Sequence, residues 1–178
     1  MAHPLEQFRF CPKCGSKHFV VHNQKSKHCK ACGFTYYFNP SAATVAVILR
    51  EQGAQGKEML VVRRAKEPAK GTLDLPGGFC DQWETGEEGV AREVMEETGL
   101  TVTATEFLFS LPNQYPYSGF LVHTVDLFFL CRVSNDEDCR AMDDAAEVQW
   151  VPLSEIRPEE FGLTSVRLGV ERVLKIKN

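Results

Sequence analysis

Residues 78–100 read Gly-Phe-Cys-Asp-Gln-Trp-Glu-Thr-Gly-Glu-Glu-Gly-Val-Ala-Arg-Glu-Val-Met-Glu-Glu-Thr-Gly-Leu, and this stretch determines the fold that we expect. Thr85, followed three residues later by Glu88, has the pattern of a capping box, which predicts the start of a helix. Gly99 is well placed to end the helix, because glycine adopts the left-handed conformation of many C-terminal caps. We therefore expect a helix over residues 85–98.

The two sides of this helix differ in chemistry. At 100° per residue, one side is apolar and can pack against a sheet; it comprises Val90, Ala91, Val94 and Met95. Glu93, Glu96 and Glu97 fall within another arc of about 100°. Carboxylates this close repel one another, and hard divalent cations such as Mg²⁺ relieve the repulsion. The alternative is a solvated acidic face, and the clustering alone does not choose between the two.

The rest of the chain after residue 39 indicates a mixed α/β domain. Apolar, β-branched runs at 44–50 and 58–63 flank a glycine-containing turn, which predicts a hairpin. Further strands are expected at 101–110, 119–133 and 145–151, and a second helix at 165–175. Proline restricts the residue before it, so we expect a domain boundary at residues 39–40, between a domain at 1–39 and one at 40–178.

Composition excludes several classes of protein. The 178 residues carry a formal charge of −4, which argues against a protein that coats nucleic acid. The longest largely apolar stretch, residues 41–49, is far shorter than the ~20 residues that span a bilayer, so no membrane partner is expected. The first ten residues lack the pattern of a secretory signal, which predicts a cytoplasmic protein.

Four of the seven cysteines form two Cys-x-x-Cys pairs, Cys11 with Cys14 and Cys29 with Cys32. Four thiolates close a tetrahedron at ~2.3 Å from zinc and leave no open position, which is typical of a structural site. The weaker alternatives are two disulfides or a redox pair. A segment this short has little core, so the metal is expected to supply most of its folding free energy.

Other cysteines and histidines are interpreted as bystanders. The histidines between the two cysteine pairs could substitute as ligands, but four cysteines already fill the site; these histidines are His18, His22 and His28. The isolated cysteines are Cys80, Cys131 and Cys139.

Residues 78–100 resemble the Nudix box: a glycine, five residues, a glutamate, seven residues, then Arg-Glu-apolar-x-Glu-Glu-x-Gly-apolar. Its nine constrained positions are filled by Gly78, Glu84, Arg92, Glu93, Val94, Glu96, Glu97, Gly99 and Leu100. Nine positions in one register are far more specific than a lone glycine motif. The resemblance implies a Nudix α/β/α sandwich with a mixed sheet, here preceded by a small four-cysteine zinc ribbon.

The resemblance also implies a mechanism. In this family Mg²⁺ or Mn²⁺ bridges the box glutamates and a diphosphate, while water attacks one phosphorus. The matching positions imply that Glu93 and Glu97 bind the catalytic metal and that Glu96 is a further ligand or the base for water. Glu84 would orient Arg92 and hold the loop to the helix.

Residues around the box complete the expected site. The family pattern implies that the Gly78 carbonyl reaches a metal, and a ligand from outside the box is often needed. Glu147 resembles the glutamate that many members place before a late strand; the alternative is an ordinary surface glutamate. His123 and Asp126 interrupt an apolar strand, which fits either a substrate cleft or a partly exposed strand.

A four-cysteine ribbon followed by a Nudix box is similar to the NADH pyrophosphatase branch, which usually has a larger domain ahead of the ribbon; the 178 residues contain none. That branch carries the signature Ser-Gln-Pro-Trp-Pro-Phe-Pro after the box, and residues 110–116 read Ser-Leu-Pro-Asn-Gln-Tyr-Pro. The missing tryptophan weighs against NADH as the preferred substrate. A proline at the position of Pro116 also occurs in some ADP-ribose pyrophosphatases.

Residues 110–116 are expected to form a loop that contacts a nucleobase. Tyr115 and Tyr117 offer stacking faces, and Asn113 and Gln114 offer hydrogen-bond donors and acceptors. An equally weighted alternative is a proline-rich turn that packs its tyrosines against the sheet.

These features predict a Mg²⁺- or Mn²⁺-dependent hydrolase with a small nucleotide substrate. It would cleave the diphosphate of a nucleoside diphosphate linked to another moiety, such as an NADH- or NAD-like dinucleotide or ADP-ribose. The rivals are a nucleotide-sensing module and an enzyme that processes capped RNA through the basic ribbon. Nucleic acid is therefore an alternative partner, and homodimer formation is an expectation from related enzymes.

Overall fold

The computed structural model describes residues 3–52, 56–134 and 136–177. The chain divides into two compact units, Met1–Pro40 (unit 1) and Ser41–Asn178 (unit 2). Among the described residues, no helix combines the length and apolar character needed to cross a membrane.

Unit 1 is a small antiparallel sheet with very little core. Its strands are β1 (Phe19–Asn23), β2 (Ser26–Cys29) and β3 (Thr35–Tyr37), in the order β1-β2-β3. The buried cluster consists of Cys11, Phe19 and Cys29, with Phe8 and Phe34 packed against it. A core of this size is too small to stabilise the unit alone, so the cysteine site must contribute.

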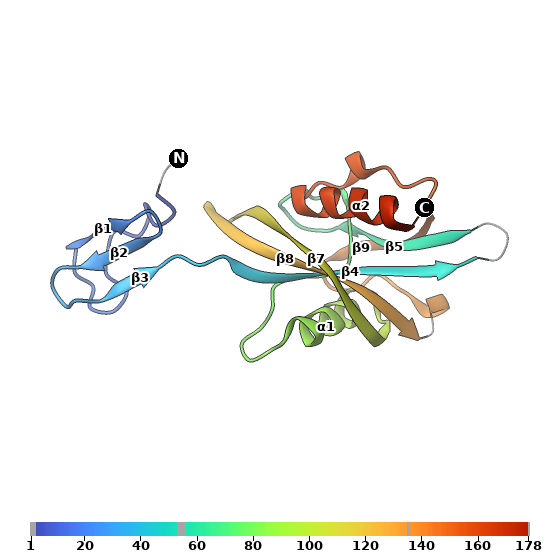
Figure 1. Ribbon diagram of the computed structural model, residues 1–178, viewed down its shortest axis with the longest axis horizontal. Coiled ribbons are helices and arrows are strands. Elements are labelled where there is room, and N and C mark those ends of the chain that lie inside the picture. Colours follow the sequence, from blue (N-terminus) through green and yellow to red (C-terminus); the bar gives the residue numbers. More distant parts are fainter. Residues whose placement is uncertain (1–2, 53–55, 135, 178) are drawn as a thin grey trace. The chain divides into compact units, whose positions relative to one another are not determined.

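Unit 2 is built on a mixed sheet, as the family resemblance implied (Figure 1). Its strands are β4 (Ser41–Glu51), β5 (Lys57–Arg64), β6 (Leu73–Asp74), β7 (Thr101–Tyr117), β8 (Phe120–Ser134) and β9 (Ala145–Pro152). The order is β6-β5-β4-β8-β7, and β9 pairs with β5. Strands β4 and β8 are parallel and the other pairs are antiparallel. The expected β4–β5 hairpin is confirmed, although residues 53–55 of its turn lie outside the described residues.

Helices cover both faces of this sheet. Figure 1 shows α1 (Gly86–Thr98) on one face and α2 (Thr164–Lys177) on the other. Side chains of β4 alternate between the two cores, because successive strand residues point to opposite faces. Val45 and Val47 pack in the core beneath α2, whereas Ala46 and Ile48 pack in the core beneath α1. Two short 3₁₀ turns, η2 (Asp136–Asp138) and η3 (Pro158–Glu160), lie in the connections that follow β8 and β9.

Both ends of α1 are confirmed. Glu88 N–H donates to Thr85 Oγ1 at 3.2 Å, and Thr85 N–H donates to Glu88 Oε2 at 2.9 Å, which completes the capping box. Gly99 has φ of 73°, and its N–H donates to the Met95 carbonyl at 2.9 Å. These local contacts fix where the box helix begins and ends.

The expected apolar side of α1 was partly wrong. Val90 and Val94 are fully buried and pack under the sheet, but Met95 is 41% exposed. The buried stripe follows residues four apart, Val90, Val94 and Thr98, and Met95 lies about 100° away from Val94 around the helix axis. The buried face is therefore narrower than the sequence pattern predicted.

The expected loop at residues 110–116 is also wrong, because these residues belong to β7. Asn113 pairs with Thr124 of β8, and Pro112 and Pro116 lie within the paired register. Within the described sheet β7 pairs only with β8, so β7 is an edge strand. Proline is tolerated in an edge strand, because no neighbouring strand accepts hydrogen bonds along its unpaired edge. A strand places alternate side chains on opposite faces, and this alternation decides which of residues 113–117 face the pocket.

Candidate functional site

A pocket of about 360 Å³ lies in unit 2 beside the box helix. Its lining includes eight carboxylates, from Asp74, Asp81, Glu93, Glu96, Glu97, Asp126, Asp143 and Asp144. Only three cationic side chains line it, those of Arg64, Lys66 and Arg92. Such an excess of hard oxygen donors is the environment that divalent cations prefer.

The segment before the box is held against β4 and forms one wall of the pocket. The Gly78 carbonyl accepts from Thr44 N–H at 2.8 Å, and the Pro76 carbonyl accepts from Ala46 N–H at 2.7 Å. A Cβ atom on Gly77 would lie 2.1 Å from the Thr44 carbonyl oxygen, so only glycine permits this approach. The same geometry directs Gly77 N–H at Glu97 Oε2, 3.1 Å away.

Arg92 is the centre of an ion-pair network on α1. Its guanidinium donates to both oxygens of Glu84, at 2.9 and 3.0 Å, and to the Phe79 carbonyl at 3.0 Å. It also donates to Glu93 and Glu96, at 2.9 Å each. Arg92 thus ties the loop to the helix and offsets the repulsion among the box carboxylates.

The surroundings of Glu97 and Glu93 differ from those of Glu84. Burial raises the pKa of Glu97 to about 8, despite the hydrogen bond from Gly77 N–H. Burial also raises the pKa of Glu93, against the opposing influence of Arg92. Hydrogen bonds from Arg92 instead lower the pKa of Glu84. A bound cation would stabilise Glu93 and Glu97 more than Glu84, because burial destabilises the charge of these two side chains.

Gly78 lies beside Glu93, since a Cβ atom built on Gly78 would be 2.4 Å from Glu93 Oε1. The structure therefore brings together four expected metal-site positions, Gly78, Glu93, Glu96 and Glu97, along one pocket. Glu147 does not join them. Its carboxylate accepts from Arg63 Nε at 3.0 Å, its side chain is 52% exposed, and it does not line the pocket.

Of the residues expected to contact a base, Asn113 and Tyr115 line the pocket and Tyr117 does not. Tyr117 is 63% exposed and stacks on Tyr115 at a centroid distance of 6.4 Å. The Tyr115 ring also meets Phe79 edge to face at 5.7 Å, which gives the pocket an aromatic wall. Gln114 is exposed on the opposite face of β7.

Sequence reasoning missed other groups in the pocket. Arg64 donates to Asp74 at 2.6 Å and to the Tyr115 hydroxyl at 3.2 Å. Burial raises the pKa of Asp74, although Arg64 opposes this shift. The buried hydroxyl of Thr44 lines the pocket and has no partner among the described residues. No local motif marks these residues, because only the tertiary fold brings them together.

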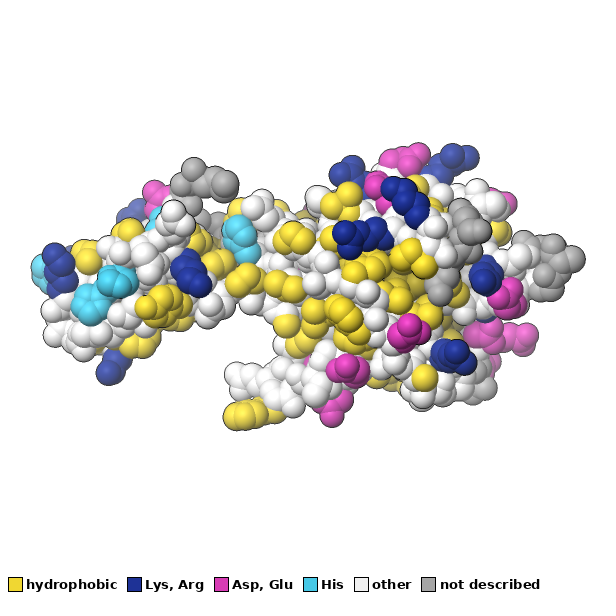
Figure 2. Space-filling view, viewed as in Figure 1, with side chains coloured by type: hydrophobic (Ala, Val, Ile, Leu, Met, Phe, Trp, Pro, Cys, Tyr) yellow, Lys and Arg dark blue, Asp and Glu magenta, His cyan; other side chains and the backbone are white. Residues whose placement is uncertain are grey.

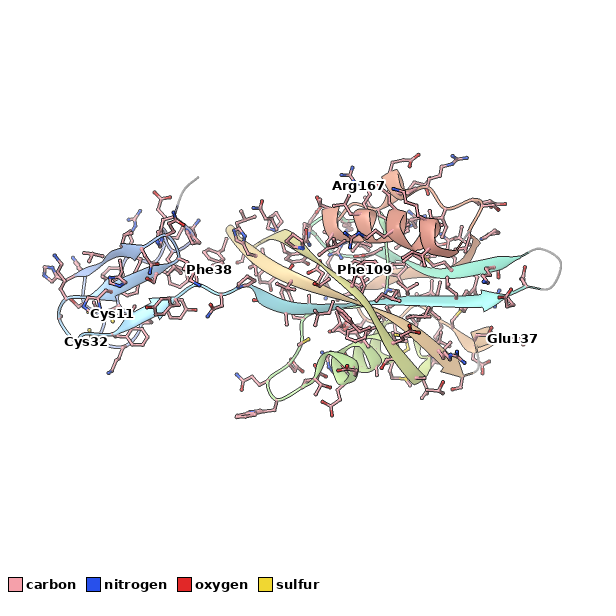
Figure 3. The ribbon with its side chains drawn as sticks, viewed as in Figure 1. Cys11, Cys32, Phe38, Phe109, Glu137 and Arg167 are labelled. Atoms are coloured by element: carbon pink, nitrogen blue, oxygen red, sulfur yellow. The ribbon has the colours of Figure 1, made fainter. Side chains whose placement is uncertain are left out.

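The four cysteines of unit 1 form a closed group. The Sγ atoms of Cys11 and Cys32 lie 3.8 Å apart, those of Cys14 and Cys29 lie 3.6 Å apart, and all four lie within 4.8 Å of one another. Figure 3 labels Cys11 and Cys32 at the same end of the unit. Tetrahedral zinc with bonds of about 2.3 Å requires sulfurs about 3.8 Å apart, whereas a disulfide requires about 2.0 Å. The donor set and spacing therefore fit a structural zinc ion.

Two glycines shape this site. Gly15 and Gly33 have φ of 72° and 75°, and their N–H groups donate to the carbonyls of Cys11 and Cys29. Among the residues that the structure describes, the cysteines are the only group of three or more Cys, His, Asp or Glu ligands packed within 4.8 Å.

The isolated cysteine Cys131 is a core residue. It is 2% exposed, and burial raises the pKa of its thiol to about 12. Burial also raises the pKa of Cys80, and the negative charge of the nearby Glu84 carboxylate raises it further. Raised thiol pKa values indicate unreactive side chains.

Two family models match the chain, one in each unit. The family model described as "NUDIX domain" matches residues 39–168. The model described as "NADH pyrophosphatase zinc ribbon domain" matches residues 6–37. The boundary between the two matches falls between residues 37 and 39, close to the division between units 1 and 2.

Similar proteins include an NAD-capped RNA hydrolase and an ADP-ribose pyrophosphatase. The NAD-capped RNA hydrolase NudC of Vibrio cholerae is 26% identical over 172 residues, which cover 97% of this chain and 60% of that protein. The ADP-ribose pyrophosphatase of Methanocaldococcus jannaschii is 32% identical over 125 residues, covering 69% of this chain and 68% of that protein. The chain thus spans about three fifths of the length of the NudC relative.

Solved structures share the fold. A crystal structure of a NUDIX hydrolase from Nitrosomonas europaea matches with a TM-score of 0.67 and 20% identity, covering 94% of this chain and 90% of that one. At that identity the likeness bears on the fold alone.

Proposed function

Because this chain belongs to the Nudix hydrolase family, we propose that it is a divalent-metal-dependent hydrolase that cleaves the diphosphate of a nucleoside diphosphate linked to another moiety. The observation that carries the proposal is the composition of one pocket. Its lining includes Glu93, Glu96 and Glu97 from the box helix together with Tyr115 and Asn113 from β7. A single pocket can therefore hold a metal-bound diphosphate and a nucleobase.

Glu93 and Glu97 are the proposed metal ligands, with the Gly78 carbonyl as a further donor. Two partly buried carboxylates and a carbonyl fit Mg²⁺ or Mn²⁺, which prefer oxygen ligands. When bound, such an ion neutralises charge that develops on the phosphate and lowers the pKa of attacking water. Glu96, whose side chain is 46% exposed, is the proposed base for that water or a further ligand.

Arg92 and Glu84 are proposed to position the ligands rather than to react. Glu84 holds two nitrogens of Arg92, and Arg92 holds Glu93 and Glu96. This arrangement fixes the carboxylate rotamers before the substrate arrives, so less ordering is needed during binding.

The proposed substrates are NAD- or NADH-like dinucleotides and ADP-ribose. A hydrolysis screen with Mg²⁺ and with Mn²⁺ tests this choice across NADH, NAD, ADP-ribose, diadenosine polyphosphates and nucleoside triphosphates. We expect a linked diphosphate to be cleaved with the highest kcat/KM and the triphosphates to be poor substrates. Preferential release of pyrophosphate from triphosphates would contradict the proposal.

A second candidate substrate is RNA with a dinucleotide at its 5′ end, and the surface of unit 1 favours it. Residues 1–39 carry six Lys and Arg against one acidic residue, and all six except the buried Lys27 are exposed. Figure 2 shows Lys, Arg and His side chains over the face in view. Phe10, Tyr36 and Tyr37 are 54%, 38% and 47% exposed. Cationic groups with exposed rings suit single-stranded nucleic acid. The NudC relative's name points the same way.

Competition between the two substrates distinguishes them. If unit 1 reads RNA, kcat/KM for NAD-capped RNA should exceed that for NAD and should fall steeply as salt rises. Equal kcat/KM values for NAD-capped RNA and NAD, with no salt dependence, would favour the small nucleotide as the substrate.

A further inference from the structure

Asp126 is a buried carboxylate that lines the pocket, and the proposed mechanism does not use it. It is 4% exposed, lies on β8 and lines the pocket. Thr124 Oγ1 donates to one of its oxygens and Ser165 Oγ of α2 donates to the other. A carboxylate offers about four acceptor positions, so these two hydroxyls leave acceptor positions that a donor from a ligand can use.

Asn113 lies beside this carboxylate on the same face of the sheet. Asn113 pairs with Thr124 across β7 and β8, and Asp126 is two residues further along β8. The Asn113 side chain is 8% exposed and lines the pocket, and it makes no hydrogen bond within the described part of the chain. Its amide atoms are not among the fully buried polar atoms, so they are open to the pocket, where a ligand can form hydrogen bonds with them.

The residues around Asp126 and Asn113 suit a flat ring. Ala43 is the β4 neighbour of Asp126 and leaves space above the sheet, because its side chain is a single methyl group. Leu163 and Val166 supply an apolar lining from the α2 side, and Tyr115 supplies an aromatic wall. Apolar faces with a few polar groups at the edge are the usual surroundings of a bound base.

We propose that Asp126 and Asn113 form a base-recognition subsite that reads the 6-amino group of adenine. Asp126 accepts from one hydrogen of the amino group, and the Asn113 amide accepts from the other hydrogen and donates to the ring nitrogen N7, as asparagine does with adenine elsewhere. Hypoxanthine has the same shape but an oxygen at position 6, which faces the carboxylate without a hydrogen. This inference rests on the proposed function and names the nucleoside that its substrate carries.

Base preference is measured in two ways, so that the inference and the proposed function can fail separately. Calorimetry compares AMP with IMP and GMP on the metal-free full chain, which needs no turnover. Steady-state kinetics compares ADP-ribose with its hypoxanthine analogue in the presence of Mg²⁺. We expect a preference of roughly 10- to 100-fold for the adenine member of each pair.

The informative variant is Asp126→Asn, because its amide can donate to the hypoxanthine oxygen. It should reduce the adenine preference to about one or reverse it, with kcat for the better substrate changed far less than KM. Asn113→Ala should weaken AMP binding and provides a second test if Asp126→Asn does not fold. Ser165→Ala is the matched control: it loosens Asp126 from α2 and lowers stability, but it should keep the adenine preference.

Each outcome of these two experiments either supports or overturns the adenine subsite. Equal binding of AMP and IMP, tighter binding of GMP, or an Asp126→Asn variant that loses stability without any change in preference would overturn the inference and leave the proposed hydrolysis standing. Adenine preference in calorimetry, lost in Asp126→Asn, would support the subsite even if no linked diphosphate were cleaved.

Discussion

Glu84 and Glu97 are glutamates of one motif, yet their surroundings move their pKa values in opposite directions. Arg92 holds both oxygens of Glu84 and lowers its pKa, whereas burial raises the pKa of Glu97 to about 8. The first is suited to a permanent ion pair. Glu97 is suited to exchange a proton for a metal ion, because the positive charge of the cation stabilises a carboxylate that burial otherwise destabilises.

This difference predicts a pH dependence of metal binding. Below pH 8 the metal-free protein holds a proton on Glu97, and a divalent ion must displace it. The apparent affinity for Mn²⁺ should therefore rise by up to about tenfold per pH unit between pH 6 and 8, and should level off above that range. Mn²⁺ titrations followed by electron paramagnetic resonance measure this affinity. A pH-independent affinity in the wild-type protein would contradict the role assigned to Glu97.

The sequence was sufficient to group the box glutamates, because residues three and four apart share a helix face and the motif covers nine positions. It was not sufficient to find Arg64, Asp74 or the partner of Asp126. Ser165 reaches Asp126 from α2, and such a contact depends on how α2 packs against β8. No local pattern encodes it.

The sequence patterns predicted both helices, strands β4, β5, β8 and β9, and residues 101–110 of β7, but not residues 111–117 of that strand. Residues 110–117 contain two prolines, which favour a loop, but β7 pairs only with β8 in the described sheet and tolerates them. The consequence for the site is direct. A strand places Asn113 and Tyr115 in the pocket and sends Gln114 to the other face, while a loop would have left all three free to turn inward.

The close approach of Gly77 to β4 leads us to expect a large effect from Gly77→Ala. The added Cβ would meet the Thr44 carbonyl, so the segment must leave β4 and take its N–H away from Glu97. We expect a loss of about 2–3 kcal/mol in the free energy of unfolding and at least roughly a 100-fold loss in kcat/KM. Thermal unfolding and hydrolysis kinetics measure the two effects.

Gly119→Ala is the control for that substitution. Gly119 also has a positive φ, 75°, but nothing lies within 4 Å of its added Cβ. This variant should lose about 1–2 kcal/mol from backbone strain alone and keep its activity. Equal loss of activity in the two variants would show that strain, and not the position of Gly77, is responsible.

Units 1 and 2 have separate cores, which makes zinc removal informative for the full chain. Cys14 is an exposed ligand, and Cys14→Ser should abolish zinc binding and unfold unit 1, because its cluster holds only three buried residues. Hydrolysis of ADP-ribose should stay within about twofold, since unit 2 carries the proposed site on its own core. Zinc content, circular dichroism and kinetics follow the change. A parallel loss of zinc and hydrolysis would show instead that unit 2 depends on unit 1.

The central claim is that the box carboxylates hold a metal ion that drives cleavage of a linked diphosphate. The most direct test compares Glu97→Gln with Glu147→Gln, both in the full chain, on the best substrate of the screen at saturating Mg²⁺. Glu97→Gln should stay folded and lower kcat by roughly 1,000-fold. Glu147, which pairs with Arg63 outside the pocket, should tolerate its substitution with less than about a tenfold change. A folded Glu97→Gln variant that hydrolyses the substrate at the wild-type rate would contradict the account.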